Sequence, residues 1–346
     1  MKTAILGAGS LGTIIGALIS KGGQDVELID VNQEHVDALN QSGAVITGTL
    51  NETIPVKAIT PDQMEGKYDL VLLLTKQLYN KSILKDLLPY LHEKSLVCSL
   101  QNGTPEEEVA SQVGVERVIS GAVHFGATWV KPGVSELTTE YNQFKAHAFD
   151  IGELDGSITD RVKEVKSILN FVGGTNISDN LIGAKWSKLL LNASLSGLSA
   201  ALNCTFGEVL NNEIAVSSAA NIADETIRVG HALNVKFLTE KNTDYNELTI
   251  NEQADLEKRI EFFRTEYAAH ALLKASMLQD LEKGKQTEID FINGVVLQKG
   301  KELGIQTPFN AMVVKLVKEA EQKQIVPEFT VNIDSFKALL LDTAKI

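Results

Sequence analysis

The chain has 346 residues, of which 44% are hydrophobic and 22% charged, and its formal net charge is −13. This length is enough for two domains with separate cores, and the composition is typical of a soluble globular protein. The excess of acidic side chains argues against nucleic acid and against an anionic membrane surface as partners, because both need basic patches. The two cysteines, Cys98 and Cys204, lie in apolar stretches and are expected to be buried free thiols. We expect neither a signal peptide nor a membrane span, so the predicted location is cytoplasmic.

The first thirty residues predict a nucleotide-binding unit of strand, turn, helix and strand. An apolar strand over residues 3–6 runs into the sequence GAGSLG, an apolar helix follows, and a second strand over residues 26–29 ends at an acidic residue. A lone GxGxxG motif is weak evidence, but this one has the flanking strand, helix and acidic residue that a dinucleotide site requires. The alternative is a glycine-rich turn that binds no ligand. The predicted cofactor-binding residues of this unit are Gly7, Gly9, Ser10, Leu11, Gly12 and Asp30.

Each position of the motif has a physical role. Gly7 permits the tight turn, Gly9 lets the backbone approach a pyrophosphate, and Gly12 lets the helix close on the sheet. The free N–H groups at the start of the helix attract the negative phosphates. Asp30 can accept hydrogen bonds from both ribose hydroxyls and would repel a 2′-phosphate, so the predicted cofactor is NAD rather than NADP.

The rest of the first half alternates strands and helices, which predicts a parallel, doubly wound sheet. The expected strands are Ala44–Thr47, Val56–Ile59, Leu70–Leu74, Leu96–Leu100 and Val118–Val123, and the expected helices are Gln33–Gln41, Asn80–Leu91, one that Pro105 opens, and Ile158–Phe171. Residues 125–152 predict antiparallel edge strands with a turn at Pro132-Gly133.

Ligands of such sheets lie beyond the carboxyl ends of the strands. Lys76, Asn102 and His124 follow three predicted strands, and the first two are expected to face the cofactor. A lone histidine in the position of His124 is more often a hydrogen-bonded structural residue than a catalytic acid. The six histidines show no metal-ligand spacing, so no metal is predicted.

Beyond residue 179 the pattern is almost wholly helical. We therefore expect a dinucleotide-binding domain over residues 1–179 and an all-helical domain over residues 180–346. The predicted fold class is α/β, a Rossmann doubly wound parallel sheet followed by an all-α domain. The polar segment Asn234–Asp255 is expected to be a solvated insertion with short helices.

One predicted helix, Ala184–Asn203, is apolar except for a stripe of polar residues. At α-helical spacing a single face would carry Lys188, Asn192, Ser196, Ser199 and Asn203. The alternative is a solvated face, but such faces normally carry several charges. A lysine in a polar cavity wall can donate a proton and stabilise an oxyanion, and Asn192 one turn later can hold a substrate oxygen.

A second polar block, SMLQD at 276–280 and TEIDFING at 287–294, lies downstream. Taken alone it predicts no more than a capping box from Thr287 to Asp290.

Together these motifs resemble the ketopantoate reductase family over essentially the whole chain. The matching features are GAGSLG, Lys76, the Gln101-Asn102-Gly103 turn, the KWSKLLLN helix start and the SMLQD…TEIDFING block. The resemblance implies a Rossmann domain, a helical domain, an active site in the cleft between them, and a homodimer through the helical domain. It implies that Lys188 is the general acid and that Glu288 orders the site near it. It further implies that Asn192 and Ser276 bind the substrate, and that Asn102 and Lys76 lie at the nicotinamide and substrate edge.

Two departures from the family pattern bear on specificity. Typical members carry a basic residue after the second strand, where this chain has Asp30, and a second asparagine on the catalytic helix, where it has Ser196. These departures resemble the NAD-dependent branch of D-2-hydroxyacid dehydrogenases of the D-mandelate type, acting on 2-oxo acids branched or aromatic at C3. The alternative is a 2-dehydropantoate 2-reductase that makes D-pantoate. A β-hydroxyacid dehydrogenase and a nucleotide-sensing protein without turnover are further alternatives, and the polar block argues against the first of these.

Overall fold

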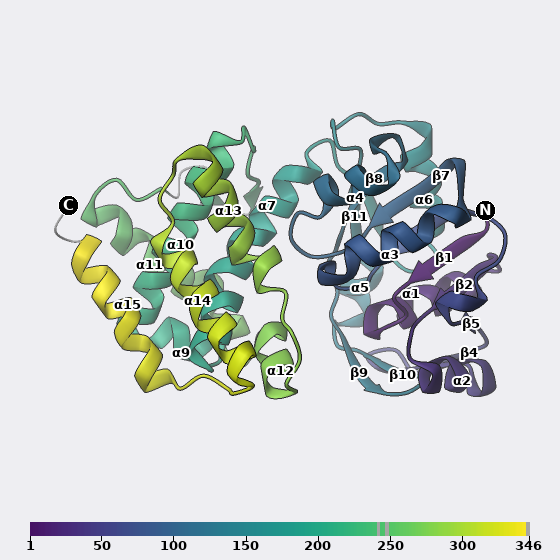
Figure 1. Ribbon diagram of the computed structural model, residues 1–346, viewed down its shortest axis with the longest axis horizontal. Helices are drawn as coiled ribbons and strands as arrows, with labels where there is room; N and C mark the ends of the chain where they lie inside the picture. Colours follow the sequence, from purple (N-terminus) through teal and green to yellow (C-terminus); the bar gives the residue numbers. More distant parts are fainter. Residues whose placement is uncertain (241–242, 246–248, 344–346) are drawn as a thin grey trace. The chain divides into compact units, whose positions relative to one another are not determined.

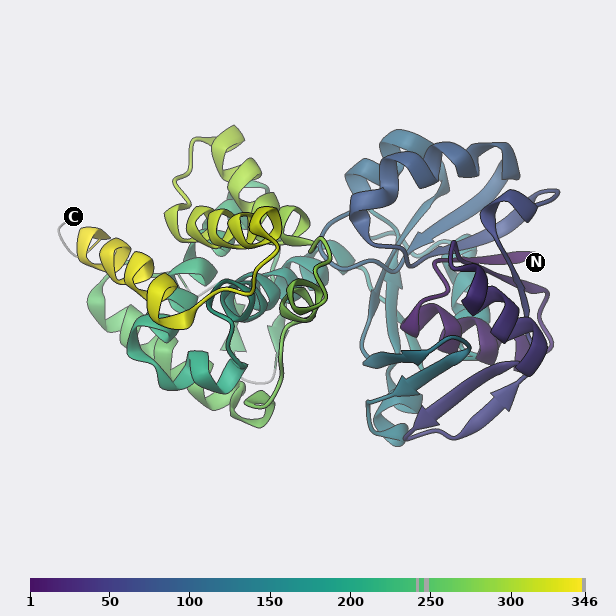
Figure 2. The same ribbon diagram turned by 60° about the horizontal axis from the view of Figure 1, so that its bottom comes forward.

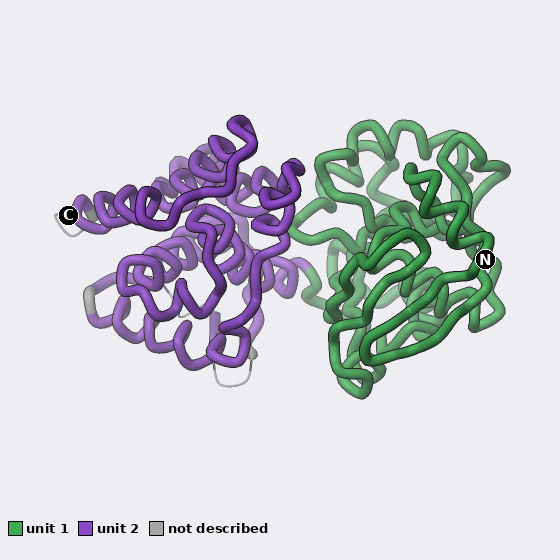
Figure 3. The backbone as a smooth tube through the Cα atoms, turned by 90° about the horizontal axis from the view of Figure 1, so that it is seen from below, with its two compact units in different colours: residues 1–181 green, residues 182–346 purple. Residues whose placement is uncertain are grey.

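The computed structural model describes residues 1–240, 243–245 and 249–343, and the chain divides into two compact units. Unit 1 comprises Met1–Leu181 and unit 2 comprises Ile182–Ile346 (Figure 3). Each unit has its own apolar core. Both cysteines are buried free thiols, as predicted.

Unit 1 is built on an eight-stranded sheet with the strand order β12-β11-β8-β7-β6-β1-β2-β5 (Figure 1). The six strands from β8 to β5 are parallel to their neighbours, whereas β11 is antiparallel to β8. The predicted doubly wound, mainly parallel sheet is therefore confirmed. The strands are β1 (Thr3–Leu6), β2 (Val26–Ile29), β5 (Lys57–Ile59), β6 (Tyr68–Leu73), β7 (Leu91–Ser99), β8 (Val118–Val123), β11 (Phe149–Gly152) and β12 (Thr175–Ile177).

Helices cover both faces of this sheet. On one face α1 (Ser10–Lys21) and α6 (Asp160–Leu169) share an apolar cluster with Ile5, and on the other α3 (Asn80–Leu87) and α4 (Glu106–Val113) share one with Leu6. Because neighbouring residues of a strand point to opposite faces, a strand buried on both sides is mostly apolar. All four residues of β1 are buried, and three of them, Ala4, Ile5 and Leu6, are apolar.

A second, four-stranded sheet packs against α1, with the order β4-β3-β10-β9 (Figure 2). Its strands are β3 (Ala44–Gly48), β4 (Glu52–Ile54), β9 (Ala127–Lys131) and β10 (Val134–Leu137), and α2 (Gln33–Ser42) precedes it in the chain. The predicted antiparallel pair with a turn at Pro132-Gly133 is present as β9 and β10. It does not lie at the edge of the main sheet, because β10 pairs with β3 instead. A short helix, α5 (Tyr141–Ala146), also interrupts the predicted strands.

Unit 2 is helical in its described residues apart from one short hairpin. Its elements are α7 (Leu181–Leu191), the π-helical turn η5 (Asn192–Ser196), α8 (Gly197–Leu202), α9 (Phe206–Asn211), α10 (Glu213–Ala232), β13 (Thr239–Glu240), β14 (Thr243–Asp244), α11 (Gln253–Glu266), α12 (Ser276–Glu282), α13 (Asn293–Leu303), α14 (Pro308–Lys323) and α15 (Phe329–Thr343). The long helix α10 packs against α9, α11, α13, α14 and α15, so it forms the centre of the unit (Figure 1). Among the described residues, no helix is both long and apolar enough to cross a membrane.

The segment predicted as a solvated insertion, Asn234–Asp255, is only partly solvated. Phe237 and Tyr245 are buried in the core of unit 2. The backbone N–H of Ile250 donates to Asp224 of α10, at 2.6 Å, so the end of the segment is tied to the central helix. Residues 241–242 and 246–248 of the segment lie outside the described residues.

Candidate active site

The three glycines of GAGSLG are required for different reasons. Gly7 has φ of 100°, and a Cβ there would lie 2.7 Å from the backbone nitrogen of Thr75. A Cβ on Gly12 would lie 2.1 Å from the carbonyl oxygen of Gly7, so helix and strand could not pack as they do. A Cβ on Gly9 would meet no atom within 4 Å. The packing of the protein explains why Gly7 and Gly12 are glycines. The open space beside Gly9 is what a ligand needs to approach the backbone.

The start of α1 is open to an anion. Gly9 is the N-cap residue, so no side chain satisfies the N–H groups of the first turn, which includes Ser10 and Leu11. The turn itself is held rigidly, because the N–H groups of Gly7 and Ala8 both donate to the carbonyl of Ile29, at 3.0 and 3.1 Å. One residue further on, the half-buried Asp30 accepts a hydrogen bond from the backbone of Asn32. A carboxylate therefore stands at the end of β2, beside the glycine turn.

His35, a residue that sequence reasoning missed, anchors the same turn. Its Nε2 lies 2.8 Å from the carbonyl oxygen of Ala8, and its Nδ1 accepts from the N–H of Gly133, at 2.9 Å. The hydroxyl of Thr13 also donates to Ala8, at 2.7 Å. Burial lowers the pKa of His35. Because Nδ1 accepts from Gly133, the proton that Ala8 accepts is carried by Nε2. No motif or spacing in the sequence signals this contact, because it joins α2 and the β9–β10 turn to a loop far away in the chain.

Lys76 and Asn102 follow neighbouring strands of the main sheet, β6 and β7. The Gln101 side chain ties these strand ends together, because its Nε2 donates to Thr75 O and to Asn80 Oδ1, both at 2.7 Å. Asn102 is exposed and Lys76 half-buried. β1, β6 and β7 are adjacent and parallel, so their carboxyl ends lie at the same end of the sheet. The glycine turn, Lys76 and Asn102 therefore all lie at that end, as expected.

In unit 2 the predicted helix is interrupted where its polar residues lie. The α-helix α7 carries Lys188, and the π-helical turn η5 begins at Asn192 and ends at Ser196. A π turn adds a residue per turn, so the predicted α-helical stripe does not continue beyond it. Ser199 is buried and donates to the carbonyl of Cys204, and Asn203 ends α8 with φ of 51°. The prediction of one polar stripe is thus wrong for these last two residues, which close the helix end.

Lys188 has an unusual electrostatic environment. Burial, with the positive charge of Lys185 as a smaller cause, lowers the pKa of Lys188 to about 8. Burial disfavours the charged form because the ammonium loses its hydration. Perturbed pKa values of this kind concentrate at functional sites.

A buried amide network supports the π turn. The Asn293 side chain donates to the carbonyl of Ala193, within η5, at 3.1 Å, and to Asn310 Oδ1 at 2.9 Å. Asn310 in turn donates to Glu225 of α10 through its side chain, at 2.7 Å, and through its backbone N–H, at 2.9 Å. Although three hydrogen bonds oppose it, burial raises the pKa of Glu225 to about 7. The sequence block TEIDFING, which contains Asn293, is therefore hydrogen-bonded to η5, the turn that directly follows α7 and Lys188.

The remaining candidate residues of unit 2 lie on neighbouring segments. Ser276 is the exposed first residue of α12, which packs against η5 and α8. Glu288 is half-buried and precedes a short turn that packs against α13. The predicted capping box from Thr287 to Asp290 is wrong. The Thr287 hydroxyl donates to Glu321, at 2.7 Å, and Asp290 forms an ion pair with Lys318 instead.

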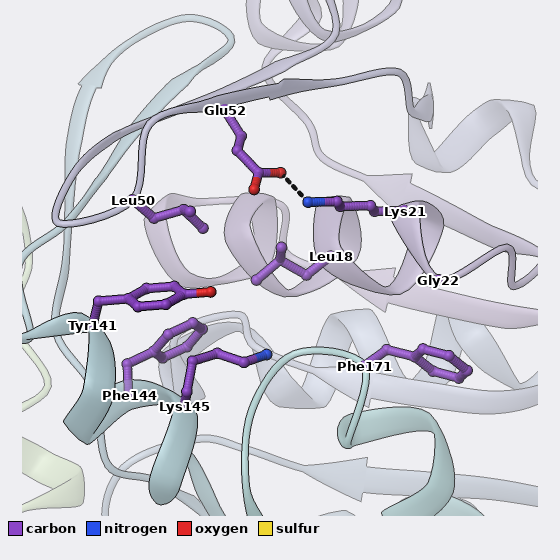
Figure 4. A pocket seen from close by; sticks show the side chains of 9 residues that line it. All are labelled: Leu18, Lys21, Gly22, Leu50, Glu52, Tyr141, Phe144, Lys145 and Phe171. Atoms are coloured by element: carbon purple, nitrogen blue, oxygen red, sulfur yellow. Dashed lines mark hydrogen bonds and ion pairs between the residues drawn. The ribbon is translucent and has the colours of Figure 1, made fainter.

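Unit 1 also contains a cavity of about 250 Å³ that lies away from the glycine turn (Figure 4). It is lined by Leu18, Lys21, Gly22, Leu50, Glu52, Tyr141, Phe144, Lys145 and Phe171. Lys21 is the last residue of α1, so the cavity lies at the opposite end of that helix from the glycine turn, roughly 16 Å away at 1.5 Å per residue. Lys21 is paired with Glu52, and Lys145 donates to the carbonyl of Val172. The cavity is not part of the candidate active site.

Comparison with known proteins agrees with this architecture. The family models "Ketopantoate reductase PanE/ApbA" and "Ketopantoate reductase PanE/ApbA C terminal" match residues 3–153 and 180–321. The chain therefore belongs to the ketopantoate reductase family, which is a family of oxidoreductases.

Individual relatives match over nearly their whole length. A 2-dehydropantoate 2-reductase of Pyrococcus horikoshii is 32% identical over 93% of this chain and 98% of its own. A D-mandelate dehydrogenase, solved with NADH and anilino(oxo)acetate, superposes with a TM-score of 0.79 at 25% identity, over 94% of this chain and 99% of its own. A PanE/ApbA family ketopantoate reductase from Ralstonia eutropha has the same TM-score and coverage at 27% identity.

Proposed function

We propose that this protein transfers a hydride between a nicotinamide dinucleotide and C2 of a 2-oxo acid or D-2-hydroxy acid, with Lys188 as general acid and base. Membership of the ketopantoate reductase family and the open space at Gly9 carry the hydride-transfer part of this proposal. The role of Lys188 is supported by burial, which lowers its pKa to about 8. At neutral pH such a lysine is mostly protonated, yet it gives up its proton more readily than an exposed lysine. A general acid is most effective when its pKa lies near the working pH.

The cofactor is assigned to the glycine turn of unit 1. The open space at Gly9 and the uncapped start of α1 fit a pyrophosphate. Asp30 would accept hydrogen bonds from the ribose, which favours NADH over NADPH. When bound, the reduced nicotinamide supplies the hydride. The residues Lys76 and Asn102 would hold its reactive end and the substrate.

The substrate carboxylate and carbonyl are assigned to unit 2. Lys188 would donate its proton to the oxygen that becomes the hydroxyl, and Asn192 would hold that oxygen by a hydrogen bond. Ser276 would bind the substrate carboxylate, Ser196 would line the substrate site, and Glu288 would orient Lys188. The homodimer through unit 2 and the cytoplasmic location stay predictions, and sedimentation of the intact protein tests the first.

Two classes of substrate are candidates for this site. The curated relatives named 2-dehydropantoate 2-reductase favour 2-dehydropantoate, which is therefore the first substrate to test. A D-2-hydroxyacid dehydrogenase of the D-mandelate type is the second candidate. Two observations favour it: Ser196 is shorter than the asparagine of typical members and leaves room for another substrate, and Asp30 stands where typical members carry a basic residue.

The deciding experiment measures oxidation of NADH and of NADPH with 2-dehydropantoate, 2-oxoisovalerate and phenylglyoxylate. Fastest turnover of the first substrate makes the protein a 2-dehydropantoate 2-reductase, whereas fastest turnover of the other two makes it a D-2-hydroxyacid dehydrogenase. Oxidation of 3-hydroxy acids alone would contradict both, and cofactor binding without any turnover would leave a nucleotide-sensing protein.

Cofactor preference is tested separately by Asp30→Arg. We expect the ratio of kcat/KM for NADH to that for NADPH to fall, because the carboxylate no longer repels the 2′-phosphate and the guanidinium attracts it. The control is Asp37→Arg, which makes the same charge change at an exposed position of α2. An equal shift in both variants would mean that net charge, rather than the position of Asp30, sets the preference.

A further inference from the structure

Two histidines and one aspartate of unit 1 converge outside the candidate active site. His124 Nε2 lies 2.8 Å from one carboxylate oxygen of Asp150, and His147 Nε2 lies 2.8 Å from the other. The two imidazole rings are stacked, with centroids 4.4 Å apart and an angle of 29° between their planes. Each ring therefore points its own Nε2 at the carboxylate of Asp150.

The backbone of the main sheet fixes this arrangement. His124 follows β8, and its N–H donates to the carbonyl of Ala148 at 2.9 Å. In the antiparallel pairing of β8 with β11, Asp150 lies opposite Ala122, two residues before His124, so both side chains are on one face of the sheet. His147 lies just before β11, three residues from Asp150. Backbone hydrogen bonds between β8 and β11 thus fix the positions of His124 and Asp150.

We propose that His124, His147 and Asp150 form a binding site for a divalent transition-metal ion of the Zn²⁺ class. One donor atom from each residue lies within 4.8 Å of the others. This separation is little more than twice the metal–ligand bond length of about 2.0–2.2 Å, so an ion between them needs only small side-chain movements. Two imidazoles and a carboxylate suit Zn²⁺, Ni²⁺ or Cu²⁺ better than Mg²⁺ or Ca²⁺, which prefer oxygen ligands alone.

The donor types of the cluster also fit a cation. A carboxylate supplies negative charge, and an imidazole in its neutral form can carry its proton on Nδ1, which leaves the Nε2 lone pair for a metal. Both histidine side chains are partly exposed, at 33% and 43%, so an ion can enter from solvent.

The chain offers a matched control in the same unit. His92 lies 3.0 Å from Asp69 and has a similar exposure, but in the part of the chain that the structure describes no second histidine joins that pair. Among the described residues, His124, His147 and Asp150 are the one group of three or more histidine, cysteine or carboxylate side chains whose donor atoms converge in this way. If convergence of three ligands creates the site, removal of His92 has no effect on metal binding.

The test uses the intact protein, stripped with a chelator, and titrates Zn²⁺ by calorimetry and Co²⁺ by its visible absorption. We expect one ion per chain, an increase in Tm with Zn²⁺, and at least roughly 100-fold weaker binding in His124→Ala, His147→Ala and Asp150→Asn, since loss of outer-shell partners alone costs up to that much. Asp150→Asn keeps the shape of the side chain and guards against misfolding. His92→Ala should bind as the unaltered protein does.

Two results would overturn the proposal. One is Zn²⁺ binding of equal strength in all four variants, which would locate the ion elsewhere. The other is no saturable binding by the unaltered protein, which would leave a hydrogen-bonded histidine pair that stabilises β8 against β11. Neither readout depends on enzymatic activity, so the outcome is separate from that of the proposed function.

Discussion

Lys188 depends on its surroundings for its proposed role. An exposed lysine has a pKa near 10.4 and is a poor acid at neutral pH. Here burial lowers the pKa to about 8, and the positive charge of Lys185, three residues earlier on α7, contributes in the same direction. The pKa of Lys188 therefore depends on its burial and on the charge of Lys185, and the charge of Lys185 can be removed separately by mutation.

We predict that kcat for 2-oxo acid reduction falls as the pH rises through about 8, because only the protonated Lys188 can donate. In Lys188→Ala, kcat should drop roughly 10²–10⁴-fold and this pH dependence should disappear. Lys185→Met removes a neighbouring positive charge, which raises the pKa of Lys188, so the decline should move to higher pH with little change in kcat at neutral pH. A pH profile that is the same in Lys188→Ala would assign the titration to another group.

At the scale of secondary-structure elements, the π turn η5 separates α7 from α8 at the residues proposed to bind substrate. A π turn is rarely stable by itself and is frequent at functional sites. Here the side chain of Asn293 donates to the carbonyl of Ala193 inside the turn, and a Cβ on Gly197 would lie 2.4 Å from Asn293 Oδ1. The close approach of α13 to Gly197 therefore holds η5, and with it Asn192, in place.

Removing the Asn293 side chain tests this link. In Asn293→Ala the carbonyl of Ala193 loses a buried hydrogen bond, so we expect the free energy of unfolding of unit 2 to fall by about 1–3 kcal/mol. We also expect kcat to fall, because Asn192 and Ser196 lie in the turn that loses its support. The control is Asn221→Ala, which removes a side-chain hydrogen bond to the carbonyl of Ser217 within α10. Reduced stability with unchanged kcat would make Asn293 a purely structural residue.

These contacts also explain how far the sequence alone could predict the protein. The glycine turn, the buried parallel strands and the helical second half follow from local spacing and apolar pattern, and the structure contains them. The π turn could not be predicted, because Ala193 and Asn293 are 100 residues apart and α-helical spacing is the default for an apolar helix. For the same reason the spacing of the histidines along the sequence predicted no metal site. His124 lies beside His147 and Asp150 only because β8 pairs with β11. The positions of Lys76 and Asn102 just beyond β6 and β7 could be predicted from the apolar strand patterns, whereas their roles at a cofactor stay predictions.

At the scale of the whole molecule, the two units have separate cores, and the chain has one tryptophan in each. Trp129 lies on β9 of unit 1 and is 38% exposed, whereas Trp186 lies on α7 of unit 2 and is buried. Removing one tryptophan therefore leaves a fluorescence reporter for the unfolding of the other unit. The proposed cofactor residues Gly7, Gly9 and Asp30 all belong to unit 1.

We predict that NAD⁺ stabilises unit 1 selectively. In Trp186→Phe the remaining Trp129 should report a higher Tm when NAD⁺ is added, with a stabilisation of about 2.7 kcal/mol at a concentration 100 times the Kd. In Trp129→Phe the remaining Trp186 should report an unchanged Tm, because a ligand stabilises only the cooperative unit that binds it. The oxidised cofactor is used because the reduced nicotinamide absorbs tryptophan emission. Equal shifts in both variants would mean that the two cores unfold as one cooperative unit, and a shift in neither would contradict the assignment of the cofactor to the glycine turn.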